Sequence, residues 1–144
     1  MIEKVSYKND MLALIVRGKY RGRKGITFFT PKESIQQFGY MRHKKSHIIN
    51  PHLHKKRKTR IMYTSEVILL LKGLLRVDFY SNKKKYLFSK ILKEKDIIML
   101  VKGGHGFKVL KEVQMIEIKQ GPYSLSKDKI KFDNIDENKI KIKK

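Results

Sequence analysis

The chain has 144 residues, and its 35 Lys and Arg against 13 Asp and Glu give a net charge of +22. A chain of this length with 40% hydrophobic residues is expected to form one domain that buries a core without metal or disulfide staples. It contains no cysteine, which excludes disulfides, thiolate catalysis and Cys-based zinc sites, so any metal must bind His and carboxylate groups.

The periodicity along the chain is that of short strands. Each predicted strand is rich in β-branched and aromatic residues and is bounded by turn-forming residues. The predicted strands cover residues 11–16, 26–29, 46–54, 61–71, 74–80, 86–92, 97–101, 107–110 and 114–119. Short antiparallel strands at this spacing are typical of a β-sandwich or a β-barrel.

The segments between the strands predict hairpin turns and one helical turn. Lys72-Gly73 and Gly103-Gly104 each separate two apolar runs, as hairpin turns do. Residues 31–37 begin with a proline, which suits the first position of a helix, so we expect one or two helical turns there. The domain is predicted to cover residues 1–125. The lysine-rich tail, residues 126–144, is either an edge strand protected by its lysines or a frayed end.

No segment has the length that a membrane span requires. The longest unbroken apolar run, Met11 to Val16, has six residues. A transmembrane helix needs about 20 apolar residues, and the apolar core of a signal peptide has about 7–15. We therefore expect a cytoplasmic protein with no membrane span.

The positive charge is spread along the chain and comes mainly from lysine, with 28 Lys and seven Arg. Arginine is the usual bidentate reader of phosphates and base edges. No zinc-finger or RNP pattern accompanies the charge. The pattern favours solvated lysines, or attraction of a small anionic substrate, over nucleic-acid binding.

The histidines provide the sharpest chemical signal. His52 and His54 are two residues apart, so in a strand both point to the same face. Neutral imidazole suits Zn, Fe, Ni or Cu, and an added carboxylate extends the choice to Mn. Two surface histidines with no ligand are the plain alternative.

Glu66 and His105 could complete such a site. Glu66 stands in an apolar run, and a buried carboxylate needs a metal or a cationic partner. His105 follows Gly103-Gly104, and glycine lets the backbone approach closely. The alternatives are a solvent-facing Glu66 and an ordinary glycine-rich turn.

Together these residues resemble the cupin family over roughly residues 46–120. The order His52-x-His54, Glu66 and Gly73 is similar to the first cupin motif, and Lys95-Asp96 through His105 to the second. Eleven residues, 55–65, separate His54 from Glu66, which is more than is usual in the family. The resemblance implies an all-β antiparallel jelly-roll barrel with an N-terminal strand extension and a basic C-terminal tail.

The resemblance also implies a function. Small single-domain cupins of this kind are associated with bacterial surface-polysaccharide biosynthesis, so we expect an isomerase- or epimerase-type enzyme that moves a proton on a sugar or nucleotide-sugar. His52, His54, Glu66 and His105 would hold a divalent metal (Zn, Fe, Mn or Ni), and His52, His105 and Tyr63 are the candidate catalytic residues. The candidate substrate-binding residues are Tyr40, Arg42, Lys55, Lys56, Arg57 and Arg60.

Other interpretations stay open at this point. In a metal-free variant, a histidine base and a tyrosine acid would act while Glu66 orients the histidine. A second class is a non-catalytic module that binds a small ligand, and a third is a basic nucleic-acid-binding protein. The resemblance further implies a homodimer.

Overall fold

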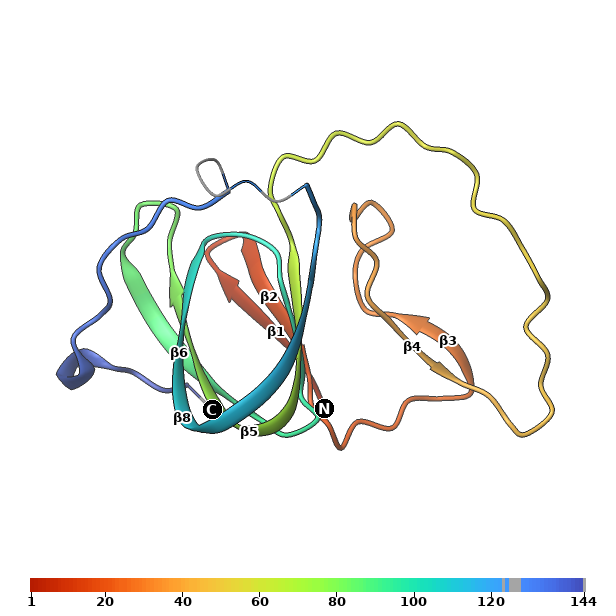
Figure 1. The fold of residues 1–144 in the computed structure, drawn as a ribbon, viewed down its shortest axis with the longest axis horizontal. Helices are drawn as coiled ribbons and strands as arrows, with labels where there is room; N and C mark the ends of the chain where they lie inside the picture. Colours follow the sequence, from red (N-terminus) through yellow and green to blue (C-terminus); the bar gives the residue numbers. More distant parts are fainter. Residues whose placement is uncertain (123, 125–127, 144) are drawn as a thin grey trace. The chain divides into compact units, whose positions relative to one another are not determined.

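The computed structural model describes residues 1–122, 124 and 128–143. The protein is all-β, with a strongly curled antiparallel sheet that forms a half-barrel and a small two-stranded sheet (Figure 1). It divides into two compact units, which we describe separately: residues 1–20 with 63–144, and residues 21–62.

The half-barrel belongs to the first unit. Its strands follow the order β1 (Ile2–Tyr7), β2 (Asp10–Val16), β7 (Ile97–Leu100), β5 (Glu66–Tyr80) and β6 (Tyr86–Lys93), while β8 (Gly104–Lys119) pairs with β5. All of these pairings are antiparallel. The predicted strands at 107–110 and 114–119 are therefore parts of one long strand, β8.

β5 and β8 bend together (Figure 1), and the register of their ladder shifts between Leu70 and Leu75, on either side of Gly73. The inward-facing side chains change from even to odd positions across it: Glu66, Ile68 and Leu70 are buried before the bend, and Leu75, Val77 and Phe79 after it. Register shifts in the β5–β8 ladder between Leu70 and Leu75 absorb this change. Gly73 has φ of +96°, a conformation that favours glycine. Lys72-Gly73 is thus a bend within one strand, and the predicted hairpin turn is wrong.

The core fills the inside of this curl. Its fully buried members come from β2, β5, β6 and β7, and they include Ile15, Ile68, Leu75, Phe79, Leu92 and Ile98. Burying each such side chain contributes about 1.5–3 kcal/mol. The apolar runs that predicted strands in these segments supply the residues that build the core.

Two local predictions differ from the structure. Residues 46–54 form no strand: Pro51 lacks the N–H that a ladder requires, and Ser46 has φ of +67°. Residues 31–37 form turns instead of a helix. There the Gln37 amide donates to the carbonyl oxygens of Pro31, Lys32 and Ser34, which satisfies the backbone without a helix.

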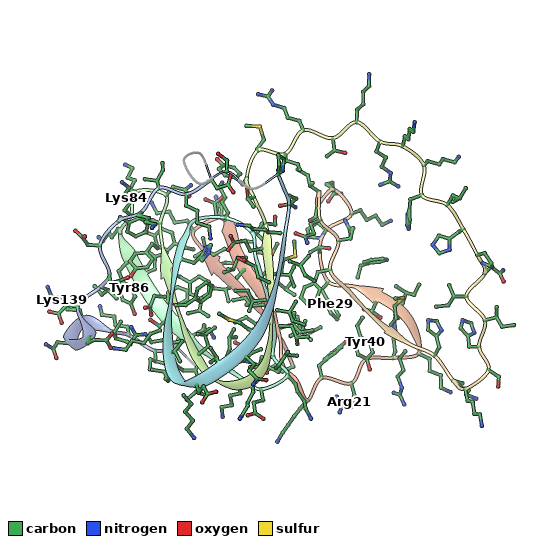
Figure 2. All side chains as sticks on the ribbon, in the orientation of Figure 1. Arg21, Phe29, Tyr40, Lys84, Tyr86 and Lys139 are labelled. Atoms are coloured by element: carbon green, nitrogen blue, oxygen red, sulfur yellow. The ribbon has the colours of Figure 1, made fainter. Side chains whose placement is uncertain are left out.

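The second unit, residues 21–62, contains the small sheet of β3 (Gly25–Phe28) and β4 (Gly39–Arg42). After β4 the chain continues to β5 with no regular secondary structure, and Figure 2 shows side chains projecting all along this segment. Most of its residues are exposed. In the part of the chain that the structure describes, no helix is long and apolar enough to cross a membrane.

The C-terminal segment lies against the half-barrel, and residues 128–143 of the predicted tail are described. Glu137, in the 3-10 helix η1 (Glu137–Lys139), forms two hydrogen bonds with Arg76, at 2.7 and 2.9 Å. Further along, Ile142 forms a parallel bridge to Ser89 of β6. Lys141 donates its N–H to the Tyr86 hydroxyl at 2.9 Å, and Tyr86 is labelled in Figure 2.

Candidate active site

Glu66 and His105 meet on the inner face of the half-barrel. Glu66 is the first residue of β5, and its side chain faces inward like that of Ile68, two residues later. His105 stands near the start of β8, opposite the buried Phe79, and paired residues in a ladder point to the same face. The Nε2 atom of His105 lies 2.9 Å from Oε2 of Glu66.

Gly103, two residues before His105, allows His105 to approach Glu66. Gly103 has φ of +80°, and a Cβ atom there would lie 2.7 Å from the carbonyl oxygen of Tyr80. A larger residue would push the turn between β7 and β8 away from the end of β5. Gly103 therefore helps to place His105 over the inner face.

Burial and charge determine how the pair is protonated. The Glu66 side chain is only 6% exposed, whereas that of His105 is 27% exposed. The hydrogen bond from His105 lowers the pKa of Glu66, against the opposing effect of burial. An ionised carboxylate only accepts hydrogen bonds, so Nε2 of His105 carries the proton that is donated to Glu66. When the ring is neutral, Nδ1 is then the nitrogen that can accept a proton.

Other groups surround the pair. The Phe107 ring lies 5.4 Å from that of His105, and Lys129 Nζ lies 3.6 Å from Oε1 of Glu66. Tyr63 and Lys102 each precede one member of the pair by three residues, and Lys102 Nζ lies 5.8 Å from the centroid of the Tyr63 ring. Tyr63 is 58% exposed.

The other two predicted metal ligands, His52 and His54, belong to the 21–62 unit. Both are exposed. Their ring centroids are 5.2 Å apart, and Nδ1 of His52 lies 2.9 Å from the carbonyl oxygen of Asn50. The structure thus pairs the predicted ligands within each unit, His52 with His54 and Glu66 with His105.

The Glu66–His105 pair fits neighbouring positions on one metal ion. Two donors with bonds of about 2.1 Å to a metal lie about 3 Å apart when the bonds are near a right angle, and the observed separation is 2.9 Å. Over residues 1–122, 124 and 128–143, no group of three or more His, Asp and Glu side chains is close enough to hold a metal.

The predicted substrate-binding residues also lie in the 21–62 unit. On β4, Tyr40 pairs with Thr27 across the small sheet, and Arg42 donates to the carbonyl oxygen of Gly22 at 3.3 Å. The remaining predicted contacts are exposed on the segment without regular structure: Lys55, Lys56, Arg57 and Arg60.

Sequence reasoning misses Lys129, because this residue lies in the lysine-rich tail, for which the sequence predicts an edge strand or a frayed end. Nothing in the run 128–131 distinguishes this lysine from its neighbours. Its position beside Glu66 results from contacts that the following residues make with β5. No family model, curated protein or solved structure matches the chain.

Proposed function

We propose that this protein is an enzyme that moves a proton on a small sugar-like substrate, with His105 as the base. The observation that carries the proposal is the 2.9 Å contact between His105 and the buried, ionised Glu66. We further propose that the half-barrel is part of a cupin-type jelly roll, in keeping with the order of motifs in the sequence.

The chemistry follows from the two nitrogen atoms of His105. Nε2 donates to Glu66, so Nδ1 accepts the proton from a substrate carbon next to a carbonyl group. The resulting imidazolium is stabilised by the Glu66 carboxylate. Return of the proton to the neighbouring carbon completes an isomerisation and restores the neutral ring.

Tyr63 is the proposed acid. As the carbon loses its proton, negative charge develops on the carbonyl oxygen, and an O–H group that donates there lowers the barrier. Tyr63 is exposed and stands three residues before Glu66 in the chain. When the enediol collapses, Tyr63 recovers its proton from the adjacent oxygen.

Metal binding is the second candidate function, and the 2.9 Å spacing of Glu66 and His105 favours it. His52 and His54 lie side by side, and Glu66 and His105 are spaced as neighbouring ligands are. The cupin resemblance implies that all four side chains would hold one divalent metal, which would polarise a substrate oxygen as a Lewis acid. Metal analysis of untagged protein, beside the variant His52→Ala/His54→Ala, tests this candidate. About one equivalent that the variant lacks would support it, and a metal-free parent would count against it.

Deuterium uptake tests the main proposal. The protein is incubated in D2O with a panel of sugar phosphates and nucleotide-sugars, and mass spectrometry records deuterium on carbon. We expect uptake with the parent and a loss of about 10²–10⁴-fold in His105→Gln. His43→Gln is the matched control, because His43 is exposed and stacks on His47. Unchanged uptake in His105→Gln, or none with any member of the panel, would overturn the proposal.

A further inference from the structure

Lys129 adds a third charged side chain to the Glu66–His105 pair. Its Nζ atom lies 3.6 Å from Oε1 of Glu66, the oxygen that His105 does not contact. The side chain is 53% exposed, whereas that of Glu66 is 6% exposed. Lys129 is therefore open to solvent while it contacts the buried carboxylate.

The chain that carries Lys129 is anchored to the end of β5. The Phe132 ring packs edge-on against Tyr80, with 5.0 Å between the ring centroids. Ile135 donates its N–H to the Tyr80 hydroxyl at 3.2 Å, and Glu137 pairs with Arg76. These three contacts hold the segment against the half-barrel, so the position of Lys129 is built into the fold.

The contact between Lys129 and Glu66 is a weak one. At 3.6 Å it is longer than a good charge-assisted hydrogen bond, which measures about 2.7–2.9 Å. An ammonium group has three donors, and a half-exposed ion pair contributes little stability. Lys129 can therefore bind a second anion with little loss of stability.

The surrounding charges are mainly positive. Lys129 and Lys119 both act on Glu66 through space. Lys102 is paired with Asp10 at 2.8 Å. One carboxylate thus faces two lysines and a histidine, an arrangement that favours an anionic ligand.

We infer that Lys129 binds the anionic group, phosphate or carboxylate, of the compound that reaches Glu66 and His105. The inference rests on the proposed function in one respect: it takes that compound to be the substrate. Anion binding itself is a property of the resting protein. It can therefore be measured without turnover.

The experiment follows the His105 imidazole signals by NMR during titration with inorganic phosphate and, separately, with acetate, at constant ionic strength. Three variants are compared with the parent: Lys129→Gln, Lys129→Arg and Lys131→Gln. Lys131 is the matched control, since it is an exposed lysine two residues further along the same segment. The arm with the tighter binding identifies which anion the site prefers.

We expect Lys129→Gln to weaken binding at least tenfold, while Lys129→Arg and Lys131→Gln stay within about twofold of the parent. Equal losses in the two glutamine variants would overturn the inference, because diffuse charge would then account for the binding. Parent His105 signals that respond to neither anion would overturn it too. Deuterium uptake tests the proposed function separately. Uptake can be absent while phosphate binding depends on Lys129, and uptake can be present while phosphate binding does not depend on Lys129.

Discussion

The Glu66 carboxylate and the His105 imidazole lie 2.9 Å apart although they are 13 positions apart along the same ladder, where His105 pairs with Phe79. In a straight sheet those positions would be roughly 40 Å apart. The curl of β5 and β8 removes that separation. The site therefore depends on the bend.

Gly73 is the residue on which the bend depends most directly. At its φ of +96°, a Cβ atom would run into the carbonyl oxygen of Glu112. We expect Gly73→Ala to lower the free energy of unfolding by more than about 2 kcal/mol, since a left-handed conformation alone costs about 1–2 kcal/mol. Urea unfolding measures the change.

Gly106→Ala is the matched control for this substitution. A Cβ atom at Gly106 would make only an ordinary contact, at 3.8 Å from the Tyr80 ring. We expect a change of less than about 1 kcal/mol. Similar losses in the two variants would show that the bend does not require glycine at position 73.

The Glu66–His105 contact should make stability depend on pH. The pKa of Glu66 is lower in the folded protein than its ordinary value of 4.5, so the contribution is present above that value and is lost as pH falls through the folded pKa. We expect Glu66→Gln to be less stable than the parent by about 1–3 kcal/mol at neutral pH. This difference should shrink in acid.

Denaturant unfolding between pH 7 and pH 3 checks this expectation, with Glu117→Gln as the control. Glu117 is an exposed carboxylate on β8, opposite Ile68. A difference between parent and Glu66→Gln that is constant over the range would contradict the account of the pair.

The sequence predicts the strands better than it predicts how they are joined. Short apolar runs identify β2, β6 and β7 because the fold buries most of those residues, and that is a local pattern. At Gly73 the inward-facing positions of β5 change from even to odd. The sequence predicts a turn there, since glycine occurs in turns and bends alike. The sequence predicts Glu66 and His105 close together because a buried carboxylate needs a partner. The position of Lys129 depends on the packing of Phe132 against Tyr80, which no local pattern reveals.

Arg76 forms a buried ion pair with Asp78 on the outer side of β5. The Arg76 Nε donates to Asp78 at 2.8 Å, and both side chains are less than 10% exposed. Removing one partner leaves a buried charge uncompensated, so we expect Arg76→Ala to cost about 3–5 kcal/mol. Chemical denaturation measures the loss. Lys139→Ala, on exposed η1, should be close to neutral, and an equally small effect of Arg76→Ala would refute the role of the pair.

Glu137 should titrate at unusually low pH. Its hydrogen bonds to Arg76, and then to Lys108, lower its pKa to about 2. Its contribution to the docking of the C-terminal segment is therefore complete above about pH 4.5 and is lost as pH falls toward 2. Carbon-13 NMR of the Glu137 carboxyl follows the titration. A midpoint near 4.5 would show that the contact does not persist in solution.

The tautomer of His105 tests the central claim most directly. Nitrogen-15 NMR of the neutral imidazole ring, recorded for the parent and for Glu66→Gln, reports which nitrogen carries the proton. We predict a proton on Nε2 in the parent, donated to Glu66, with Nδ1 unprotonated, and a changed population of the two tautomers in the variant. A parent with its proton on Nδ1, or spectra that Glu66→Gln leaves unchanged, would contradict the account.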